Sequence, residues 1–267
     1  MSISTRGTTV LITGASSGLG VEFANEFARR GADLVIVARR RERLEELAER
    51  LRREHGTTVH VVPLDLAAPD AAATLRARTD ELGVRIEHVV NNAGFGMQGE
   101  FADADPERID EMVRLNIGAL VAVTRAYLPD LVAAGTGTVV NIASTASYQP
   151  CPTMAVYGAT KAFVLSFSEA IASEVHEHGV TVLAVSPGPT RTEFFEVATG
   201  RSESPGFMQT ASQVVATAFR ALDRARPPYS VISGLGNAVG ALGARFLPRR
   251  AVIAVSARVL GRLPGAH

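Results

Sequence analysis

Short β-branched runs alternate with longer helical stretches along most of the chain. The helical stretches lie near residues 18–30, 40–54, 70–82, 106–134, 154–178 and 210–225, and the strand candidates are Thr8–Thr13, Asp33–Ala38, Val59–Leu64, His88–Asn91, Thr138–Ile142, Thr181–Val185 and Tyr229–Ser233. These runs are almost continuously apolar, which is typical of strands buried on both faces. The alternation predicts an α/β fold, a doubly wound parallel sheet of about seven strands with helices on both faces. Such sheets bind ligands beyond the carboxyl ends of their strands.

The composition is that of a globular domain. The chain has 267 residues, of which 46% are apolar and 20% charged, and disordered chains are less apolar than this. An α/β chain of this length can form one domain with a sizeable core, so we expect residues 1–267 to form a single domain. The 27 cationic and 27 acidic residues balance, whereas proteins that bind nucleic acid normally carry a basic excess. We therefore expect no nucleic-acid partner.

Cysteine and histidine offer neither a disulfide nor a metal site. Cys151 is the only cysteine, and the six histidines lack the spacing of metal ligands. Cys151 precedes the 154–178 helix and is a candidate wall residue of a substrate pocket. The stretch Met1–Thr9 is polar, and no run approaches the roughly 18 to 20 apolar residues of a membrane span. The expected location is the cytoplasm.

Three glycines follow the first strand and open the first helix. Gly14, Gly18 and Gly20 form the pattern G-x-x-x-G-x-G. Glycine permits a tight turn and lets the backbone approach a pyrophosphate, and the helix N-terminus offers free N–H groups to the phosphates. For an isolated match, an ordinary glycine turn is an equal alternative. The strand before it and the helix after it favour a dinucleotide site in a Rossmann-type fold.

The end of the second strand bears on the choice of dinucleotide. An acidic residue there would accept hydrogen bonds from the ribose 2′-hydroxyl of NAD. This chain has Arg39 instead, and Asp33 lies at the opposite end of the strand. Arginine can clamp the 2′-phosphate of NADP, so NADP is the expected cofactor and NAD is less favoured. The alternative is that the arginines coat an exposed helix start; it stays open for Arg40 and is favoured for Arg41 and Arg43.

Tyr157 and Lys161 lie four residues apart at the start of the 154–178 helix. Residues at this spacing share a helix face, so the phenol and the ammonium can point into one site. A free tyrosine has a pKa of about 10, and a nearby cation favours the phenolate. A buried tyrosine beside a solvated lysine is the alternative. Lys161 is the only lysine among the 27 cationic residues, and arginine cannot replace a compact ammonium in a tight pocket, which favours a functional role.

These motifs together resemble the short-chain dehydrogenase/reductase family in its compact, single-domain form. The resemblance runs from about Thr8 to Phe194. Thr190 departs from it, because the family often has an aliphatic residue there. The matching segments are Thr13–Gly20, Asp65, Asn91–Gly94, Asn116, Ser144, Tyr157, Lys161 and Pro187–Gly188 followed by Thr192.

The resemblance implies a hydride transfer between NADP(H) and a carbonyl or alcohol carbon, with carbonyl reduction favoured. Ser144 would donate a hydrogen bond to the substrate carbonyl, and Tyr157 would deliver the proton. Lys161 would hold the nicotinamide ribose and lower the tyrosine pKa, and Asn116 would position a water that re-supplies protons. The cofactor contacts that the resemblance implies are Gly14, Ser16, Ser17, Gly18, Leu19, Gly20, Arg39, Asp65, Leu66, Asn92, Ala93, Gly94, Tyr157, Lys161, Pro187, Gly188, Thr190 and Thr192.

The resemblance also places the substrate walls and a lid. The walls would be residues 95–98 and 145–156, and the lid would lie near residues 189–212, with Phe194, Phe195, Phe207 and Met208. These side chains suggest an apolar carbonyl substrate, although they can equally be packing residues. The alternatives are a lipid-pathway 3-oxoacyl or sterol-type reductase at a membrane surface, and a non-catalytic NADP(H) sensor, which would tend to lack Tyr157 or Lys161.

An apolar segment near residues 238–262 is predicted to be helical. It can pack on its own domain, form a subunit interface, or adsorb to a membrane surface. Its apolar face is diffuse and the chain is neutral, so packing or an interface is favoured over a membrane. The resemblance implies a homodimer or homotetramer built on the helices near 106–134 and 154–178.

Overall fold

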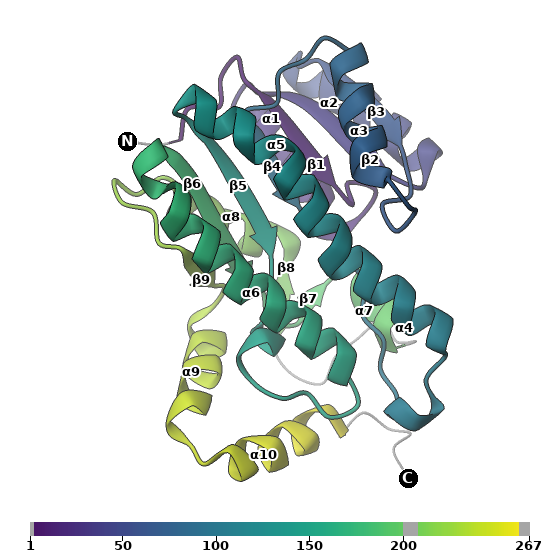
Figure 1. Ribbon diagram of the computed structural model, residues 1–267, viewed down its shortest axis with the longest axis vertical. Helices are drawn as coiled ribbons and strands as arrows, with labels where there is room; N and C mark the ends of the chain where they lie inside the picture. The colour runs from purple at the N-terminus through teal and green to yellow at the C-terminus, as the bar shows by residue number, and fades with distance from the viewer. Residues whose placement is uncertain (1–2, 200–207, 262–267) are drawn as a thin grey trace.

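Seven parallel strands form one sheet in the computed structural model, which describes residues 3–199 and 208–261 (Figure 1). Their spatial order is β3-β2-β1-β4-β5-β6-β9. Each strand ends within one residue of its expected bounds, and the doubly wound α/β fold is confirmed. The strands are β1 (Thr9–Thr13), β2 (Asp33–Ala38), β3 (Val59–Pro63), β4 (His88–Asn91), β5 (Gly137–Ile142), β6 (Val180–Ser186) and β9 (Ser230–Ile232).

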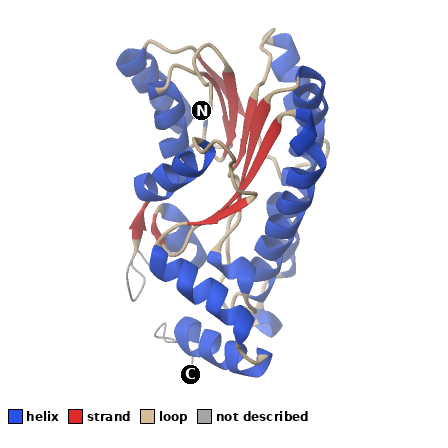
Figure 2. Ribbon diagram, turned by 90° about the vertical axis from the view of Figure 1, so that its left-hand side faces the viewer, coloured by secondary structure: helices blue, strands red, loops and turns tan. Residues whose placement is uncertain are grey.

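Helices cover both faces of this sheet (Figure 2). The side chains of β1 point alternately to the two faces of the sheet. Val10 and Ile12 belong to the hydrophobic cluster on one face, and Leu11 belongs to the cluster on the other. This period of two explains why the buried strands are apolar throughout. One layer contains α1 (Gly18–Arg29), α2 (Arg41–His55) and α8 (Ala211–Leu222), and the other contains α3 (Ala71–Glu81), α5 (Leu120–Ala134) and α6 (Ala155–Val175).

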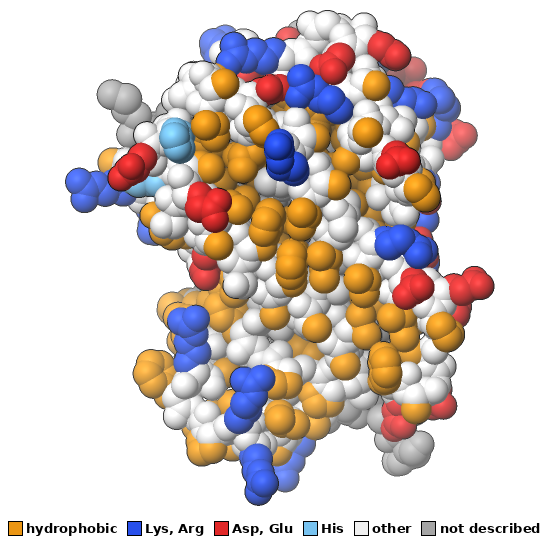
Figure 3. Space-filling model, in the orientation of Figure 1, with side chains coloured by type: hydrophobic (Ala, Val, Ile, Leu, Met, Phe, Trp, Pro, Cys, Tyr) orange, Lys and Arg blue, Asp and Glu red, His pale blue; other side chains and the backbone are white. Residues whose placement is uncertain are grey.

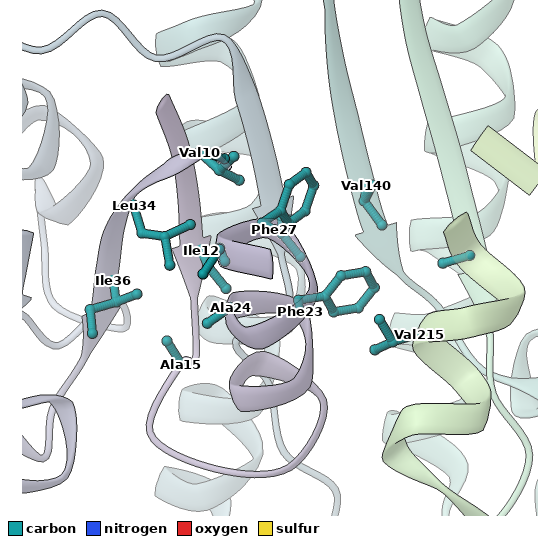
Figure 4. Packing of buried hydrophobic residues seen from close by; sticks show 14 of the residues in the cluster. Val10, Ile12, Ala15, Phe23, Ala24, Phe27, Leu34, Ile36, Val140 and Val215 are labelled. Carbon is teal, nitrogen blue, oxygen red and sulfur yellow. The ribbon is translucent and has the colours of Figure 1, made fainter. Parts of the chain in front are cut away.

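Aromatic packing joins α1 to α8 in the first layer. Figure 4 shows Phe23 and Phe27 of α1 lying between the strands and Val215 of α8. The rings of Phe27 and Phe219 meet edge to face, with their centroids 4.9 Å apart. Arg30 Cζ lies 4.2 Å from the centroid of the Phe219 ring. This cation–π contact adds a further link between the end of α1 and α8.

The predicted helix over residues 106–134 is interrupted. A π-helical turn (Arg114–Ala119) joins α4 (Pro106–Val113) to α5, and such turns often occur at functional sites. By length and composition alone, the whole run could cross a membrane. Val123, Tyr127 and Leu131 of α5 nevertheless pack into the second layer, as residues of a core helix do.

The order of the strands opens a crevice at their carboxyl ends. β1 and β4 are neighbours, although β2 and β3 lie between them in the sequence. The connections that follow β1 and β4 therefore lead to opposite sides, and ligands of doubly wound sheets bind where the connections diverge. The glycine turn follows β1 at this point.

The C-terminal part contains elements that the sequence analysis did not specify. β7 (Thr190–Arg191) and β8 (Gln209–Thr210) pair with each other, and α7 (Glu193–Thr199) follows β7. The segment near 238–262 forms two helices, α9 (Leu235–Gly243) and α10 (Arg249–Gly261), and Pro248 directly precedes the second. In the lid, Phe207 and the side chain of Phe195 lie outside the described residues. Short helical turns span Phe101–Asp103, Thr145–Tyr148, His176–His178 and Ala244–Phe246.

Candidate active site

Close packing holds the glycine turn against the end of β4. Thr13 Oγ1 accepts hydrogen bonds from the backbone N–H groups of Asn92 and Ala93, each at 3.0 Å. Asn92 Nδ2 donates to the Gly14 carbonyl oxygen at 3.1 Å. A Cβ on Gly14 would lie 2.7 Å from Asn92 Nδ2, and one on Gly20 would lie 2.3 Å from the Gly14 oxygen. Neither position has room for a side chain.

A cavity of about 510 Å³ extends from this turn to the first turns of α6. Ser17, the N-cap of α1, makes no side-chain capping bond, and the first turn of α1 holds no acidic residue, so the leading N–H groups can bind an anion. Such a cavity fits a dinucleotide. Gly20 and Asn116 do not line it. The predicted residues that do are Gly14, Ser16, Ser17, Gly18, Leu19, Arg39, Asp65, Leu66, Asn92, Ala93, Gly94, Ser144, Tyr157, Lys161, Pro187, Gly188, Thr190 and Thr192.

Arg39 lies at the end of this cavity beside β2. Its Nη1 is 3.1 Å from Glu111 Oε1 and 3.9 Å from Asp65 Oδ2, and its side chain is 59% exposed. The structure thus brings together Arg39, predicted to bind a phosphate, and Asp65, another residue that the family resemblance implies as a cofactor contact. Because the guanidinium is exposed, its carboxylate partners are exchangeable.

Arg40 and Arg43 link the cavity wall to the lid helix α7. Arg40 Nη2 donates to Ser16 Oγ at 3.0 Å, and Arg40 Nη1 lies 2.9 Å from Glu193 Oε2. Arg43 also pairs with Glu193, and together Arg43 and Arg40 hold the pKa of that carboxyl below its usual range. Arg43 is exposed and does not line the cavity, so it fits the interpretation of a surface coat although it pairs with Glu193. Arg41, which pairs one turn along its own helix, fits that interpretation too.

Tyr157 and Lys161 face the cavity from α6 and are only 8% and 5% exposed. Lys161 Nζ donates to the Ile142 carbonyl oxygen at 2.7 Å and lies 6.0 Å from the centroid of the Tyr157 ring. Burial lowers the pKa of Lys161 to about 8 and raises the pKa of Tyr157 to about 12. The expected lowering of the tyrosine pKa by Lys161 is thus not seen, because loss of hydration dominates. The phenol is protonated at neutral pH.

Ser144 begins a short helical turn at the end of β5. Its Oγ accepts a hydrogen bond from Ala146 N–H at 3.1 Å. Ser147 Oγ accepts one from Ser144 N–H at 3.2 Å and donates to the Lys161 carbonyl oxygen at 2.7 Å. Ser147 therefore ties the Ser144 turn to α6. A side-chain hydrogen bond between Ser144 and Tyr157 opposes the rise in the tyrosine pKa that burial causes.

Asn116 lies behind the cavity in the π-helical turn. Its Oδ1 accepts from Phe95 N–H at 3.0 Å, and its Nδ2 donates to the Phe95 carbonyl oxygen at 2.9 Å and to Thr160 Oγ1 at 3.1 Å. A Cβ on Gly94 would lie 2.8 Å from Asn116 Oδ1. The side chain of Asn116 thus fixes the chain after β4 against α6.

Phe194 of α7 covers the catalytic tyrosine candidate. Its ring centroid lies 5.4 Å from that of Tyr157, with the rings inclined by 47°. Gly96 lies close to both rings, and a Cβ there would be 2.9 Å from Phe194 Cζ and 3.3 Å from Tyr157 Cδ2. Cys151 was expected as a possible wall residue, but its buried thiol lies 3.4 Å from the Gln149 carbonyl oxygen, and Cys151 does not line the cavity.

The C-terminal helices contribute to the site in a way that the sequence analysis missed. α10 adds Val259 and Leu260 to the cavity wall. Gln98 Nε2 donates to the Leu260 carbonyl oxygen at 3.2 Å. Asn237 of α9 packs so closely on Gly188 that a Cβ there would lie 2.3 Å from Asn237 Nδ2. No local sequence signal announces these contacts, because each joins segments far apart in the chain.

Comparison with known proteins gives the family. The family model described as short chain dehydrogenase matches residues 8–202. The chain is also similar to sulfoacetaldehyde reductase 2 of Chromohalobacter salexigens. The two are 40% identical over 197 residues, which cover 73% of this chain and 77% of that relative.

Solved structures extend the similarity to nearly the whole chain. A short-chain dehydrogenase from Sphingobium yanoikuyae in complex with NADPH has a TM-score of 0.81 at 37% identity, covering 97% of this chain and 98% of that one. The bulky-bulky ketone specific alcohol dehydrogenase from Comamonas testosteroni has a TM-score of 0.75 at 33% identity, covering 97% and 96%. The chain therefore belongs to the short-chain dehydrogenase/reductase family and is an oxidoreductase that uses a nicotinamide cofactor.

Proposed function

We propose that this protein, acting as a single domain, reduces an apolar ketone or aldehyde to the alcohol with NADPH. The observation that carries the proposal is a buried phenol, that of Tyr157, which burial keeps protonated in a cavity shared with the glycine turn. A proton donor must hold its proton at the working pH and reach the reacting oxygen. Burial of Tyr157 supplies the first condition, and its place in the cavity beside Ser144 supports the second.

The preference for NADPH rests on the arginines at the end of β2. Arg39 and Arg40 both line the cavity, and Arg40 is bonded to Ser16 of the glycine turn. Guanidinium groups bind phosphate oxygens in a bidentate manner, so this end of the cavity suits a 2′-phosphate. The Sphingobium yanoikuyae relative, which is described in complex with NADPH, supports the same choice.

The acid–base chemistry follows from the two buried residues of α6 and the serine beside them. The nicotinamide cofactor supplies the hydride to the carbonyl carbon. Ser144 Oγ donates a hydrogen bond to the carbonyl oxygen, and Tyr157 transfers its phenolic proton to that oxygen. Tyr157 is left as a phenolate, and the positive charge of Lys161 one turn away stabilises it in a site with little water.

The proposed substrate class rests on the apolar side chains of the cavity wall, three of which pack in one cluster with Tyr157. Phe95, Met154, Phe194, Val197 and Leu260 line this part of the cavity. A sugar would need several polar partners there, whereas an apolar carbonyl compound gains from desolvating these side chains. The Comamonas testosteroni relative is described as specific for bulky ketones, which supports a large apolar substrate.

The test is NADPH consumption against a graded panel that runs from small polar ketones to aromatic ketones and long 3-oxoacyl thioesters. Turnover should rise with apolar size. Tyr157→Phe should lower kcat about 1000-fold and leave NADPH affinity nearly unchanged, because only the proton donor is lost. Tyr229→Phe, on an exposed tyrosine that does not line the cavity, is the matched control and should keep full activity.

Two results would contradict the proposal. One is turnover by Tyr157→Phe at a rate near that of the unaltered protein. The other is the absence of turnover across the panel although NADPH binds, which would point to a sensor.

A further inference from the structure

The charges of this neutral chain are strongly divided along its length. Residues 224–267 hold seven arginines and no acidic residue, so this segment has a net charge of +7. All 27 acidic side chains and the other 20 cationic ones precede it, giving a net charge of −7. Overall neutrality, which disfavoured a membrane role in the sequence analysis, therefore hides a basic C-terminal segment.

The same segment exposes an apolar surface. Of the fourteen large hydrophobic side chains exposed among the described residues, eight lie on α9, α10 and the turn between them. Phe246 is 88% exposed and Leu235 is 84% exposed. We call this surface the C-terminal patch: Leu235, Val239, Leu242, Phe246, Leu247, Ile253, Val255 and Val259, with the exposed arginines Arg245, Arg249, Arg250 and Arg258.

Among the described residues, the arginines of the C-terminal patch have no carboxylate partner. None of the ion pairs formed by residues 3–199 and 208–261 includes one of them. Figure 3 shows blue and orange side chains side by side over the lower left of the molecule, where Figure 1 places α9 and α10. Apolar side chains edged by unpaired cations are typical of segments that lie in a bilayer interface.

Charge decides between the possible occupants of the C-terminal patch. A second copy of this chain, docked through the same patch about a two-fold axis, would bring arginines against arginines. Packing on its own domain uses Val252 and Ser256 of α10, which are buried, and leaves the patch outside. An anionic lipid surface complements the arginines and accepts the apolar side chains.

We propose that the C-terminal patch docks this protein onto an anionic lipid bilayer. Val259 is 63% exposed and also lines the cavity, so the cavity opens to the surface within the patch. Docking would place this opening at the lipid. Given the proposed reduction of apolar carbonyl compounds, such a compound dissolved in the bilayer can then enter the site without crossing water.

The test is co-sedimentation of the purified full-length protein with vesicles. Vesicles of phosphatidylcholine with phosphatidylserine should bind the protein, and vesicles of phosphatidylcholine alone should bind it at least about tenfold more weakly. Added salt should weaken the binding, because the Debye length falls to about 10 Å at 0.1 M. Since no turnover is measured, this result does not depend on the proposed catalytic activity.

Two pairs of variants distinguish binding through the C-terminal patch from nonspecific binding to vesicles. Arg249→Gln with Arg250→Gln should weaken vesicle binding about 30-fold, since each arginine near the surface contributes on the order of 1 kcal/mol. Arg53→Gln with Arg78→Gln removes the same charge from exposed positions on α2 and α3 and should not change it. Phe246→Ser should weaken binding, whereas Phe101→Ser, at a 65% exposed phenylalanine outside the patch, should not. Circular dichroism and NADPH binding confirm that each variant is folded.

The proposal fails if the protein does not co-sediment with vesicles that contain phosphatidylserine, or if the control variants lose as much binding as the patch variants. It also fails if Phe246→Ser abolishes a concentration-dependent self-association while no vesicles bind. That outcome would make a second copy of the chain the occupant.

Discussion

The two ends of the cavity are built on opposite physical principles. At the catalytic end, Tyr157 and Lys161 are buried, and Lys161 is bonded to a main-chain oxygen. At the adenine end, Arg39 and Arg40 are more than 40% exposed and paired with carboxylates. Burial makes the catalytic end sensitive to shape, whereas the exposed ion pairs can exchange one anion for another. We therefore expect substitutions to cause large losses at one end and graded shifts at the other.

Among the substitutions that test this contrast between the two ends, the largest effect is expected at Lys161. Lys161→Arg keeps the positive charge, but the wider guanidinium cannot occupy the enclosed position from which Nζ donates to Ile142. We expect kcat with NADPH to fall about 100-fold to 1000-fold, close to the loss in Lys161→Met, because a misplaced cation cannot stabilise the phenolate of Tyr157. Steady-state kinetics of the two variants measure this directly. An arginine variant with near-normal kcat would break the comparison, since charge alone would then suffice at the buried end.

The features that the sequence could predict are those with a signal in one short stretch of the chain. The strands were predictable because burial on both faces makes each one an apolar run of fixed length, as in β2 and β6. Gly14 and Gly20 were predictable because the turn forbids a Cβ. Tyr157 and Lys161 were identified from a spacing of four residues on one helix. Each of these signals is local in the chain.

The missed features depend on distance and environment. Arg43 pairs with Glu193, which lies 150 residues away in the sequence. The local sequence around either residue does not predict this ion pair. The direction of the Tyr157 pKa shift depends on burial, which the spacing to Lys161 does not reveal. The sequence favours packing or an interface for the C-terminal segment, because its apolar face is diffuse and the whole chain is neutral. The proposed docking on a membrane depends in addition on the apolar side chains that α9 and α10 expose, and the sequence pattern does not reveal that exposure.

A smaller, graded effect is expected at the adenine end. Glu193 pairs with Arg40 and Arg43, so we expect it to compete with the proposed 2′-phosphate for the guanidinium of Arg40, which lines the cavity. Arg40→Gln should weaken NADPH binding about tenfold relative to NADH, because one charge-assisted contact is lost. Glu193→Gln should shift the ratio the other way, by a few-fold, because the arginines are released. Calorimetric titration with both dinucleotides measures each ratio.

A matched substitution sharpens this prediction. Glu45→Gln removes a carboxylate that pairs with Arg41 along its own helix and should leave both affinities unchanged. Weaker NADPH binding by Glu193→Gln would show that the carboxylate positions the arginines for the phosphate instead of competing with it.

The smallest effect is expected at His88, which tests burial away from the cavity. His88 begins β4, packs 6.0 Å from the Phe27 ring and is 5% exposed. Burial lowers the pKa of its imidazole, and the nearby Glu87 carboxylate opposes this shift only in part. The unfolded chain therefore takes up a proton near the ordinary pKa of about 6.5, while the folded protein takes it up only at lower pH. The free energy of unfolding should thus be unaffected by His88 above about pH 6.5 and should decrease below it.

Urea unfolding at pH 7 and pH 5 measures this decrease. The His88 contribution is on the order of 1 kcal/mol between these pH values, since one site changes the free energy by at most about 1.4 kcal/mol per pH unit. His88→Leu should reduce the pH dependence by that amount, and His55→Leu, at an exposed position, should leave it unchanged. Equal pH dependence in the His88 variant and the unaltered protein would mean that the folded protein accommodates the imidazolium. Burial would then be too weak an effect to explain the shifted pKa values of Tyr157 and Lys161. The difference between the buried and the exposed end of the cavity would instead have to come from specific hydrogen bonds and ion pairs.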